Sequence, residues 1–482
     1  MIGERSGTGQ RPASATARIS RVLVANRGEI ALRIIRACRA LGIETVLAVS
    51  QADRDSLPAR LADRSLCIGP APAKESYLDG RLIVAAALGS ECDAVHPGYG
   101  FLAESPELAQ ACATNGIRFV GPKPAQILQM GNKLQARELA RRCGVPILPG
   151  SEKVRSHEEA SSVATRIGLP VMLKAASGGG GRGMKVVADL ALMPQMFASA
   201  SAEARAAFGD DTLYLERYLP NARHIEVQVL GDCRGNVIHL GERDCSLQRR
   251  HQKMVEEAPA PAIGEALRAA LRDAAVKLAV AVGYENAGTV EFIVDQDAGK
   301  FYFLEMNTRI QVEHPVTESI TGIDIVEEQF RIASGEALRY AQSEIQFRGH
   351  AIECRVTAEL PDEGFRPNAG RLAAWSPPEG PNIRVDSHCY AGYQVPVHYD
   401  SLLAKLIVYG SDRAQALERM LRALEQFTVL GIGTSLPFLH FVVGRPEFAA
   451  GGVNTRLVEE LIQQRSAERG ARSAAAPAMP RE

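Results

Sequence analysis

Five polar residues recur at every second position in one short segment of this sequence. The residues before it, 301–304, are aromatic and aliphatic, which is typical of a strand. If the strand continues, one of its faces carries Glu305, Asn307, Arg309, Gln311 and Glu313. A carboxylate and a carboxamide two positions apart can both bind Mg²⁺ through oxygen, and a neighbouring arginine can hold a planar anion. The segment therefore predicts a site for Mg²⁺, phosphate and a small oxyanion, with a solvated strand face as the ordinary alternative.

A second carboxylate is expected to face this segment. Residues 288–294 form another predicted strand, and residues 295–299 form a turn that leads back to the first one. Such a hairpin places Glu291 near Glu305. Two facing carboxylates repel each other unless a cation neutralises them, so this pairing also favours a bound metal ion.

A glycine-rich loop, residues 177–183, lies between two apolar segments that read as strands, 169–176 and 184–187. Phosphate-binding loops of nucleoside triphosphatases and dinucleotide-binding folds run from a strand into a helix, whereas this loop runs from strand to strand. It is therefore predicted to be a hairpin flap whose backbone N–H groups close over phosphates. Lys174 precedes the loop and can reach those phosphates. A flexible surface linker is the alternative.

Three other segments carry candidate site residues. Residues 212–219 read as a strand that ends near Glu216, which is a weak signal for an adenine contact. Residues 243–253 are the most basic part of the chain, and anions are expected to concentrate there unless the run is a solvated surface. Arg355, in a predicted strand at 350–356, is a candidate for contacting a carbonyl or enolate, with a surface arginine as the alternative.

Composition limits the function classes. The 482 residues are 46% hydrophobic and 23% charged, with a net charge of −1, so neither a nucleic-acid surface nor a polybasic membrane surface is indicated. No apolar run is long enough to span a bilayer. The nine scattered cysteines show no metal-binding or disulfide spacing and fit a reducing compartment. A βαβ unit at the N-terminus lacks the glycine pattern of dinucleotide-binding folds.

Five motifs, taken in order, closely resemble the biotin carboxylase family, the ATP-grasp component of biotin-dependent carboxylases. They are VANRGEI (24–30), HPGYGF (96–101), SGGGGRG (177–183), RDCSLQRRHQK (243–253) and EMNTRIQVEHP (305–315). The resemblance implies an α/β and α+β fold. Its expected parts are a Rossmann-like domain (19–130), an ATP-grasp domain (131–345) with a mobile flap subdomain at about 147–220, an α+β C-terminal domain (346–465), and disordered tails (1–18 and 466–482).

The resemblance also assigns roles to matching positions, in a reaction that converts ATP, bicarbonate and protein-bound biotin into ADP, phosphate and carboxybiotin. The ATP-binding positions are Lys133, Lys174, Gly180, Gly181, Glu216, Arg217, Tyr218, Leu219, His224, Gln248, His251, Glu291 and Glu305. The bicarbonate positions are Lys253, Arg309, Gln311, Val312 and Glu313, and the biotin positions are Tyr99 and Arg355. Glu291, Glu305 and Asn307 match ligands of Mg²⁺ or Mn²⁺, with two ions implied. Arg217 departs from the family, which usually has lysine there.

The implied catalytic residues are Lys253, Arg309, Glu313 and Arg355. Lys253 and Arg309 orient bicarbonate, and Glu313 accepts its proton as a general base. Arg355 stabilises the enolate of biotin. Closure of the flap shields the carboxyphosphate intermediate from water.

The sequence contains no Ala-Met-Lys-Met biotin-attachment motif. We therefore expect a subunit that works with a biotin carboxyl carrier protein and carboxyltransferase subunits, without nucleic-acid or membrane partners. The resemblance implies a homodimer, and the cysteine pattern fits a cytoplasmic location. The nearest match in architecture is the biotin carboxylase subunit of bacterial acetyl-CoA carboxylase, an enzyme that forms malonyl-CoA for fatty acid synthesis. Alternatives are a subunit of a propionyl-CoA, other acyl-CoA or pyruvate carboxylase, another ATP-grasp ligase, or an inactive nucleotide-binding regulator.

Overall fold

The computed structural model describes residues 18–176 and 184–465. Its N-terminal part is a parallel five-stranded sheet in the order β3-β2-β1-β4-β5. The strands are β1 (Arg21–Val24), β2 (Glu44–Ser50), β3 (Arg64–Gly69), β4 (Ala94–His96) and β5 (Arg118–Phe119). Helices α1 (Gly28–Leu41), α3 (Gly80–Gly89) and α4 (Pro106–Thr114) connect or follow them. This arrangement confirms the predicted Rossmann-like architecture, and Gly42 in the left-handed conformation ends α1.

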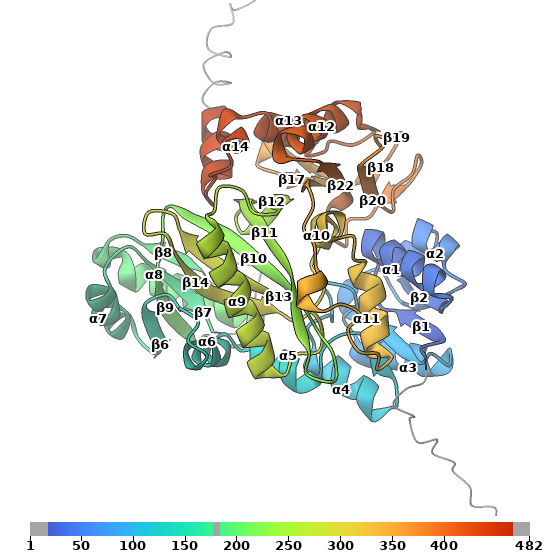
Figure 1. Ribbon diagram of the computed structural model, residues 1–482, viewed down its shortest axis with the longest axis horizontal. Coiled ribbons are helices and arrows are strands. Elements are labelled where there is room, and N and C mark those ends of the chain that lie inside the picture. The colour runs from blue at the N-terminus through green and yellow to red at the C-terminus, as the bar shows by residue number, and fades with distance from the viewer. Residues whose placement is uncertain (1–17, 177–183, 466–482) are drawn as a thin grey trace, which may run out of the picture.

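An antiparallel eight-stranded sheet forms the centre of the molecule, in the order β14-β13-β10-β11-β12-β15-β22-β20. Its first five strands are β14 (Lys300–Asn307), β13 (Asn286–Asp295), β10 (Ala222–Gly231), β11 (Val237–Arg249) and β12 (Gln252–Ala258). One face is apolar and packs against α9 (Glu265–Val282), which crosses it in Figure 1. The opposite face carries the polar residues of β10, β11, β13 and β14.

The sheet continues without a break into the C-terminal part, because β12 pairs with β15 (His350–Thr357). Beyond it lie β22 (Leu402–Gly410) and the edge strand β20 (Ile383–Ser387). Helices α12 (Arg413–Gln426) and α13 (Leu436–Val443) cover their apolar face, and Asp412 caps α12 through the Gln415 N–H. The segments before and after the boundary predicted at residue 345 therefore share one hydrogen-bonded sheet.

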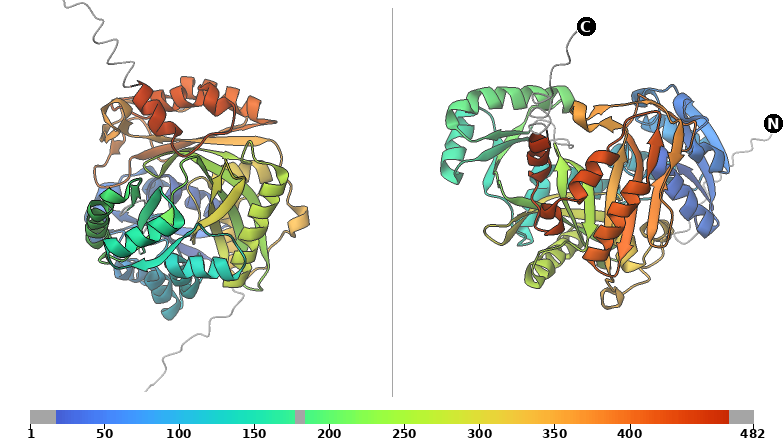
Figure 2. Two further views of the ribbon diagram at one scale, coloured as in Figure 1. Left: turned by 90° about the vertical axis from the view of Figure 1, so that its left-hand side faces the viewer. Right: turned by 90° about the horizontal axis from the view of Figure 1, so that it is seen from above.

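A separate four-stranded sheet has the order β6-β9-β7-β8. It contains β6 (Gly150–Val154), β7 (Val171–Ala175), β8 (Lys185–Val187) and β9 (Leu213–Arg217), packed against α7 (His157–Ile167) and α8 (Met193–Phe208). The antiparallel pairing of β7 and β8 agrees with the predicted hairpin. The glycine loop itself, with Gly180 and Gly181, lies outside the described residues. This small sheet and the N-terminal sheet lie at opposite ends of the molecule (Figures 1 and 2).

Two further features concern the cysteines and the helices of the described residues. All nine cysteines are unpaired, as their spacing predicted. Among the described residues, no helix combines the length and apolar character needed to cross a bilayer.

Candidate active site

A cavity of about 1330 Å³ lies between the small sheet, the polar face of the central sheet and the N-terminal part. It brings together nearly all the described residues that the sequence singled out. Those that line it are Tyr99, Lys133, Lys174, Glu216, Arg217, Tyr218, Leu219, His224, Gln248, His251, Lys253, Glu291, Glu305, Asn307, Arg309, Gln311, Val312 and Arg355. Glu313 is the exception, because it is fully buried behind the cavity wall and reaches it through Lys253 and Arg355.

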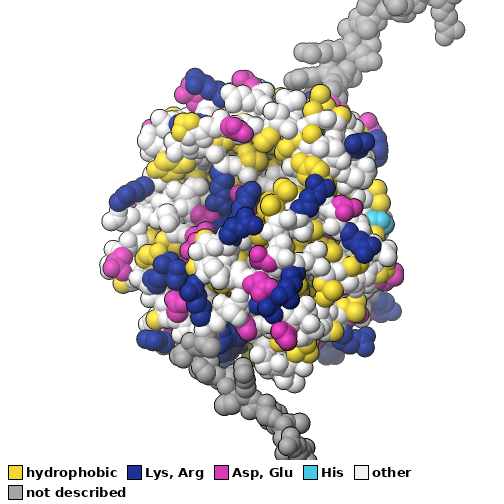
Figure 3. All heavy atoms as spheres, turned by 90° about the vertical axis from the view of Figure 1, so that its right-hand side faces the viewer, with side chains coloured by type: hydrophobic (Ala, Val, Ile, Leu, Met, Phe, Trp, Pro, Cys, Tyr) yellow, Lys and Arg dark blue, Asp and Glu magenta, His cyan; other side chains and the backbone are white. Residues whose placement is uncertain are grey.

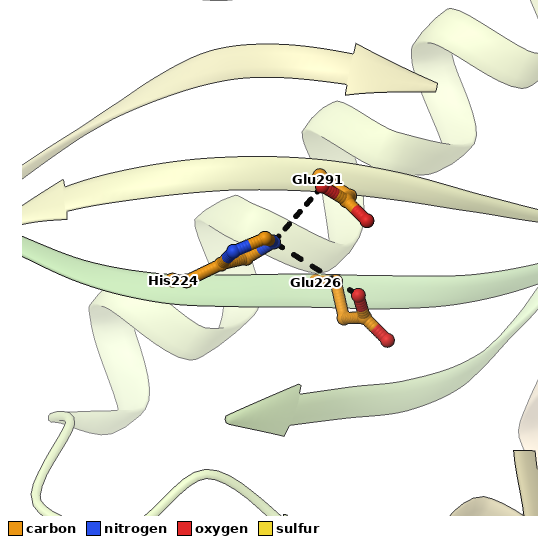
Figure 4. Close-up of side chains that lie close together, drawn as sticks. All are labelled: His224, Glu226 and Glu291. Atoms are coloured by element: carbon orange, nitrogen blue, oxygen red, sulfur yellow. Dashed lines mark ion pairs between the residues drawn. The ribbon is translucent and has the colours of Figure 1, made fainter. Parts of the chain in front are cut away.

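Glu291 and Glu305 face each other across β13 and β14, as the hairpin predicted. Glu291 accepts hydrogen bonds from Lys253 Nζ at 3.0 Å and from Asn307 Nδ2 at 2.7 Å. Its other oxygen lies 3.0 Å from His224 Nε2, and both side chains project from the same face of the sheet (Figure 4). Burial alone would raise the pKa of Glu291, but Lys253 and His224 outweigh burial and lower it well below the ordinary range.

The same residues offer an oxygen-rich donor set for a divalent cation. Glu305 pairs with Lys133 at 3.3 Å, and its side chain is 33% exposed toward the cavity. Carboxylate and carboxamide oxygens from Glu291, Glu305 and Asn307 suit a hard cation. A tighter group of potential ligand atoms, from His224, Glu226 and Glu291, lies deeper. Glu226 is already bound by Arg243 and Lys253, so that group is better explained as an ion-pair network.

The strand expected to run from Glu305 to Glu313 ends at Asn307. Residues 308–313 form a loop, and α10 (His314–Thr321) begins directly after it. The prediction of a continuous strand face was therefore wrong beyond Asn307, and the side chains converge for a different reason. The Arg309 guanidinium holds the loop by donating to Asn307 Oδ1 at 3.1 Å and to Gln311 Oε1 at 2.9 Å.

Arg309 has a further partner that the sequence did not reveal. Its Nε donates to Glu104 Oε2 at 2.9 Å, and Glu104 also accepts from the Thr308 N–H at 3.0 Å. Glu104 comes from the N-terminal part, just after the HPGYGF motif. Since the two segments lie about two hundred residues apart in sequence, no local spacing pattern could have predicted this contact.

Glu313 lies between two cations. Lys253 Nζ donates to Glu313 Oε1 at 2.7 Å, and Arg355 Nη2 donates to Oε2 at 2.9 Å. Burial would raise the pKa of Glu313, but Lys253 and Arg355 lower it well below the usual range, so the carboxylate stays ionised. Burial would lower the pKa of Lys253, but Cys245 and the surrounding carboxylates raise it, so the ammonium also stays charged.

Arg243 corrects the expectation that residues 243–253 present one cationic surface. Its side chain is fully buried and donates to Glu226 Oε1 at 2.5 Å, so it is not available to an anion. A register shift between Leu247 and Gln248 places Lys253 among the site carboxylates. His251 lies in the exposed turn between β11 and β12, and Gln248 is buried on β11.

The other end of the cavity lies at the small sheet. Lys174 Nζ lies 2.7 Å from Glu216 Oε2, and Arg137 contacts the other oxygen of the same carboxylate. Burial and Lys133 lower the pKa of Lys174 to about 7, and Glu305 acts in the opposite direction. The Arg217 side chain is exposed, and its backbone N–H already donates to Pro149.

The two residues predicted to lie near biotin, Tyr99 and Arg355, line the same cavity. The Tyr99 hydroxyl donates to Glu29, and Arg355 forms ion pairs with both Glu256 and Glu313. Only 18% of the Arg355 side chain is exposed, so the alternative of a solvated surface arginine does not hold.

Three family models match successive parts of the chain. They are the biotin carboxylase N-terminal domain (residues 18–127), the carbamoyl-phosphate synthase L chain ATP-binding domain (132–341) and the biotin carboxylase C-terminal domain (353–460). A protein called biotin carboxylase from Nostoc sp. is 51% identical over 445 residues, which cover 92% of this chain and 99% of the relative. This chain belongs to the biotin carboxylase family.

Its membership makes it an ATP-grasp carboxylase, and two further relatives show how widely the family is used. One of the subunits of pyruvate carboxylase from Methanothermobacter thermautotrophicus is 49% identical over 92% of this chain and 90% of its own length. The biotin carboxylase domain dimer of Hydrogenobacter thermophilus 2-oxoglutarate carboxylase superposes with a TM-score of 0.89 at 47% identity. That match covers 92% of this chain and 98% of the other, whose structure is a complex with MgADP, ADP and bicarbonate.

Proposed function

We propose that this biotin carboxylase uses ATP and bicarbonate to carboxylate biotin on a separate carrier protein, through carboxyphosphate. The observation that carries the proposal is the position of Glu313, an ionised carboxylate bound at 2.7 Å by Lys253 and at 2.9 Å by Arg355. A base placed between two cations suits an anionic substrate, because the cations attract bicarbonate while the base accepts its proton.

The residues divide into two halves along the cavity. At one end, Lys133, Lys174 and the segment 216–219 bind the nucleotide, with Gly180, Gly181, His224, Gln248 and His251 as further contacts. At the other end, Arg309, Gln311 and Val312 hold bicarbonate beside Lys253, and Tyr99 and Arg355 meet biotin. Carboxyphosphate formed where the two halves meet would thus lie close to biotin, which limits its loss to water.

Glu291, Glu305 and Asn307 would hold Mg²⁺ or Mn²⁺. Such an ion neutralises charge on the transferring phosphate, and two ions would suit the two facing carboxylates. The chain's own contribution is to aim three oxygen donors at the nucleotide end of the cavity and to keep Glu291 ionised through Lys253 and His224.

Bicarbonate-dependent ATP hydrolysis stimulated by free biotin tests this function directly. Stimulation by biotin is the expected result. ATP turnover with bicarbonate but without any response to biotin would instead favour another ATP-grasp ligase, and ATP binding without turnover would favour a regulator.

The physiological role that we propose is the first half-reaction of a cytoplasmic acetyl-CoA carboxylase, working as a homodimer with a biotin carboxyl carrier protein and carboxyltransferase subunits. The face that includes the N-terminal part carries acidic and basic side chains interspersed with hydrophobic ones (Figure 3). The pyruvate and 2-oxoglutarate carboxylase relatives support a second candidate, a subunit of a keto-acid carboxylase. Isolating the biotinylated protein that co-purifies with this chain, and identifying its transferase, distinguishes the two.

A further inference from the structure

Glu353, in the middle of β15, is a buried carboxyl group without a visible partner. Its side chain is 0% exposed, and neither of its oxygens accepts a hydrogen bond from the described residues. An ionised carboxylate that is buried without hydrogen bonds or a cation is strongly destabilising, so such a group usually takes up a proton. Glu353 plays no part in the function proposed above.

A second buried carboxyl group stands directly opposite it. Glu256 on β12 pairs with Glu353 in the antiparallel register, which places their side chains on the same face of the sheet. Glu256 Oε1 accepts from Arg355 Nε at 2.6 Å and contacts Arg355 Nη2 at 2.5 Å. Its other oxygen, Oε2, has no hydrogen-bond partner in the described part of the chain. The pair therefore has three oxygens that accept no hydrogen bond from the described residues.

The charged groups around the pair do not supply a cation for Glu353. Those that act on it are Arg355 on its own strand, Lys405 on β22, Glu256 on β12 and Glu313 before α10. Lys405 is taken up by Glu29 at 3.2 Å, by Asp386 at 3.8 Å and by the Val312 carbonyl at 2.9 Å. Lys253 acts on Glu256 from its own strand but contacts other carboxylates.

Burial thus raises the pKa of both members of the pair. It raises the pKa of Glu353 well above its ordinary value, with Lys405 opposing. For Glu256, burial outweighs the opposing effect of Arg355 and raises the pKa to about 7. Glu353 is therefore neutral at physiological pH, while Glu256 changes its charge close to neutrality.

Glu256 and Glu313 bind the same nitrogen of Arg355, at 2.5 Å and 2.9 Å. The charge on Glu256 consequently decides how firmly the guanidinium is held between the two carboxylates. We propose that Glu256 and Glu353 form a buried acid pair that holds one proton near neutral pH and positions Arg355, through Glu256, for the biotin step. This inference rests on the proposed function, because it assigns Arg355 to biotin.

The direction of the pH effect follows. Above about pH 7, Glu256 is ionised and anchors Arg355 through a charge-assisted hydrogen bond. Below that pH it becomes neutral and the anchor weakens. The value of kcat/KM for free biotin is therefore expected to fall as the pH decreases through the neutral range.

The test compares Glu256→Gln and Glu353→Gln with the unmodified protein, using kcat/KM for free biotin from pH 6 to 8. Ratios to the unmodified protein cancel the ionisation of bicarbonate and ATP. Glu256→Gln should cost roughly tenfold at pH 8, where a charged anchor is lost, and less than about twofold at pH 6. Glu353→Gln should leave the inflection at the same pH, since a neutral group replaces a neutral group.

Two outcomes would overturn the proposal. A loss in Glu256→Gln that is equal at pH 6 and pH 8 would mean a structural role only. An inflection that moves to lower pH in Glu353→Gln would mean that Glu353 is charged in the unmodified protein.

Infrared spectroscopy of the unmodified protein covers the case in which the variants do not fold. A carbonyl band of a protonated carboxyl group at pH 7.5 is expected, and its absence would contradict the proposal. This measurement requires no turnover, so an absent band contradicts the proposal even if biotin fails to stimulate ATP hydrolysis and the proposed function is wrong.

Discussion

Glu291 and Glu305 occupy paired positions on β13 and β14, yet each is neutralised by a different lysine. Lys253 binds Glu291 at 3.0 Å from the side where we propose bicarbonate, and Lys133 lies 3.3 Å from Glu305 on the side where we propose the nucleotide. The two carboxylates thus mark the boundary between the two halves of the cavity. A divalent cation bound by both carboxylates would lie between Lys253 and Lys133.

Replacing Glu305 with glutamine is expected to weaken metal activation. Glutamine keeps an oxygen ligand but removes the charge that attracts the cation. The Mg²⁺ concentration for half-maximal ATP turnover should rise by at least roughly tenfold. That factor is the smallest loss of metal affinity typical for residues that only hydrogen-bond to a metal ligand. Titration of ATP hydrolysis with Mg²⁺ measures this, and Glu265→Gln on the exposed start of α9 is the matched control. An unchanged titration would remove Glu305 from the metal site.

Replacing Arg309 with lysine should impair the use of bicarbonate. The guanidinium contacts Glu104, Asn307 and Gln311 through three different nitrogens, and a lysine ammonium cannot reproduce that planar geometry. We expect kcat/KM for bicarbonate to fall roughly ten- to a hundredfold, with KM for ATP almost unchanged. Steady-state kinetics with bicarbonate varied tests this, with Arg348→Lys, an exposed residue, as control. A shift in KM for ATP alone would place Arg309 in the nucleotide half instead.

Substitutions at Arg217 and Glu216 should have very different effects on the protein, although the two residues are neighbours. Arg217→Lys restores the residue usual in the family at an exposed position, so KM for ATP should change less than about twofold. Glu216→Gln leaves Lys174 and Arg137 without their shared carboxylate and should destabilise the protein by roughly 3 kcal/mol. Thermal unfolding and ATP kinetics of both variants test the contrast. A clear rise in KM for ATP in Arg217→Lys would instead show that the Arg217 side chain contacts the nucleotide.

The stability of the fold should decrease on mild acidification, in part because of His96. Its Nδ1 accepts the Gly98 N–H at 3.0 Å, and burial lowers its pKa to about 3. An unfolded chain binds a proton below about pH 6.5 that the folded chain does not, so stability is lost as the pH falls below that value. The loss should be on the order of 2 kcal/mol at pH 5.

Unfolding in urea at pH 7.5 and pH 5 measures this dependence. His96→Asn keeps an acceptor for the Gly98 N–H but cannot take up the proton, so its stability should depend less on pH. His398→Asn, at an exposed position, serves as the control. Parallel pH dependence in all three proteins would exclude His96 as a source of the effect.

Local patterns predicted those parts of the site that a hairpin or a single strand determines. The pairing of Glu291 with Glu305 follows from a short turn between two strands, and Lys174 follows from its strand. The alternation rule failed beyond Asn307, because the chain leaves the sheet and α10 begins seven residues later. Side-chain hydrogen bonds from Arg309 then bring the loop residues together, and no periodicity encodes such bonds.

Contacts between distant segments explain the remaining failures. Glu104, Glu226 and Glu256 each bind a residue predicted to be catalytic, but they come from three separate parts of the chain. Anions were expected along residues 243–253 because that segment is basic, whereas the register of Arg243 opposite Glu226 buries it in an ion pair. Sequence shows how many charges a segment has, and only the fold shows which of them cancel.

The pairing of β12 with β15 joins Lys253, Arg355 and the Glu313 that both of them bind into one continuous hydrogen-bonded framework. Amides of both strands should consequently exchange with solvent at the same slow rate, through global unfolding only. Separating the ATP-grasp part from the C-terminal part at residue 345 would strip β12 of its neighbour and leave an unsatisfied edge prone to aggregation. Among the described residues, the small sheet of β6 to β9 shares no strand pairing with this framework, so it can move without breaking the framework's hydrogen bonds.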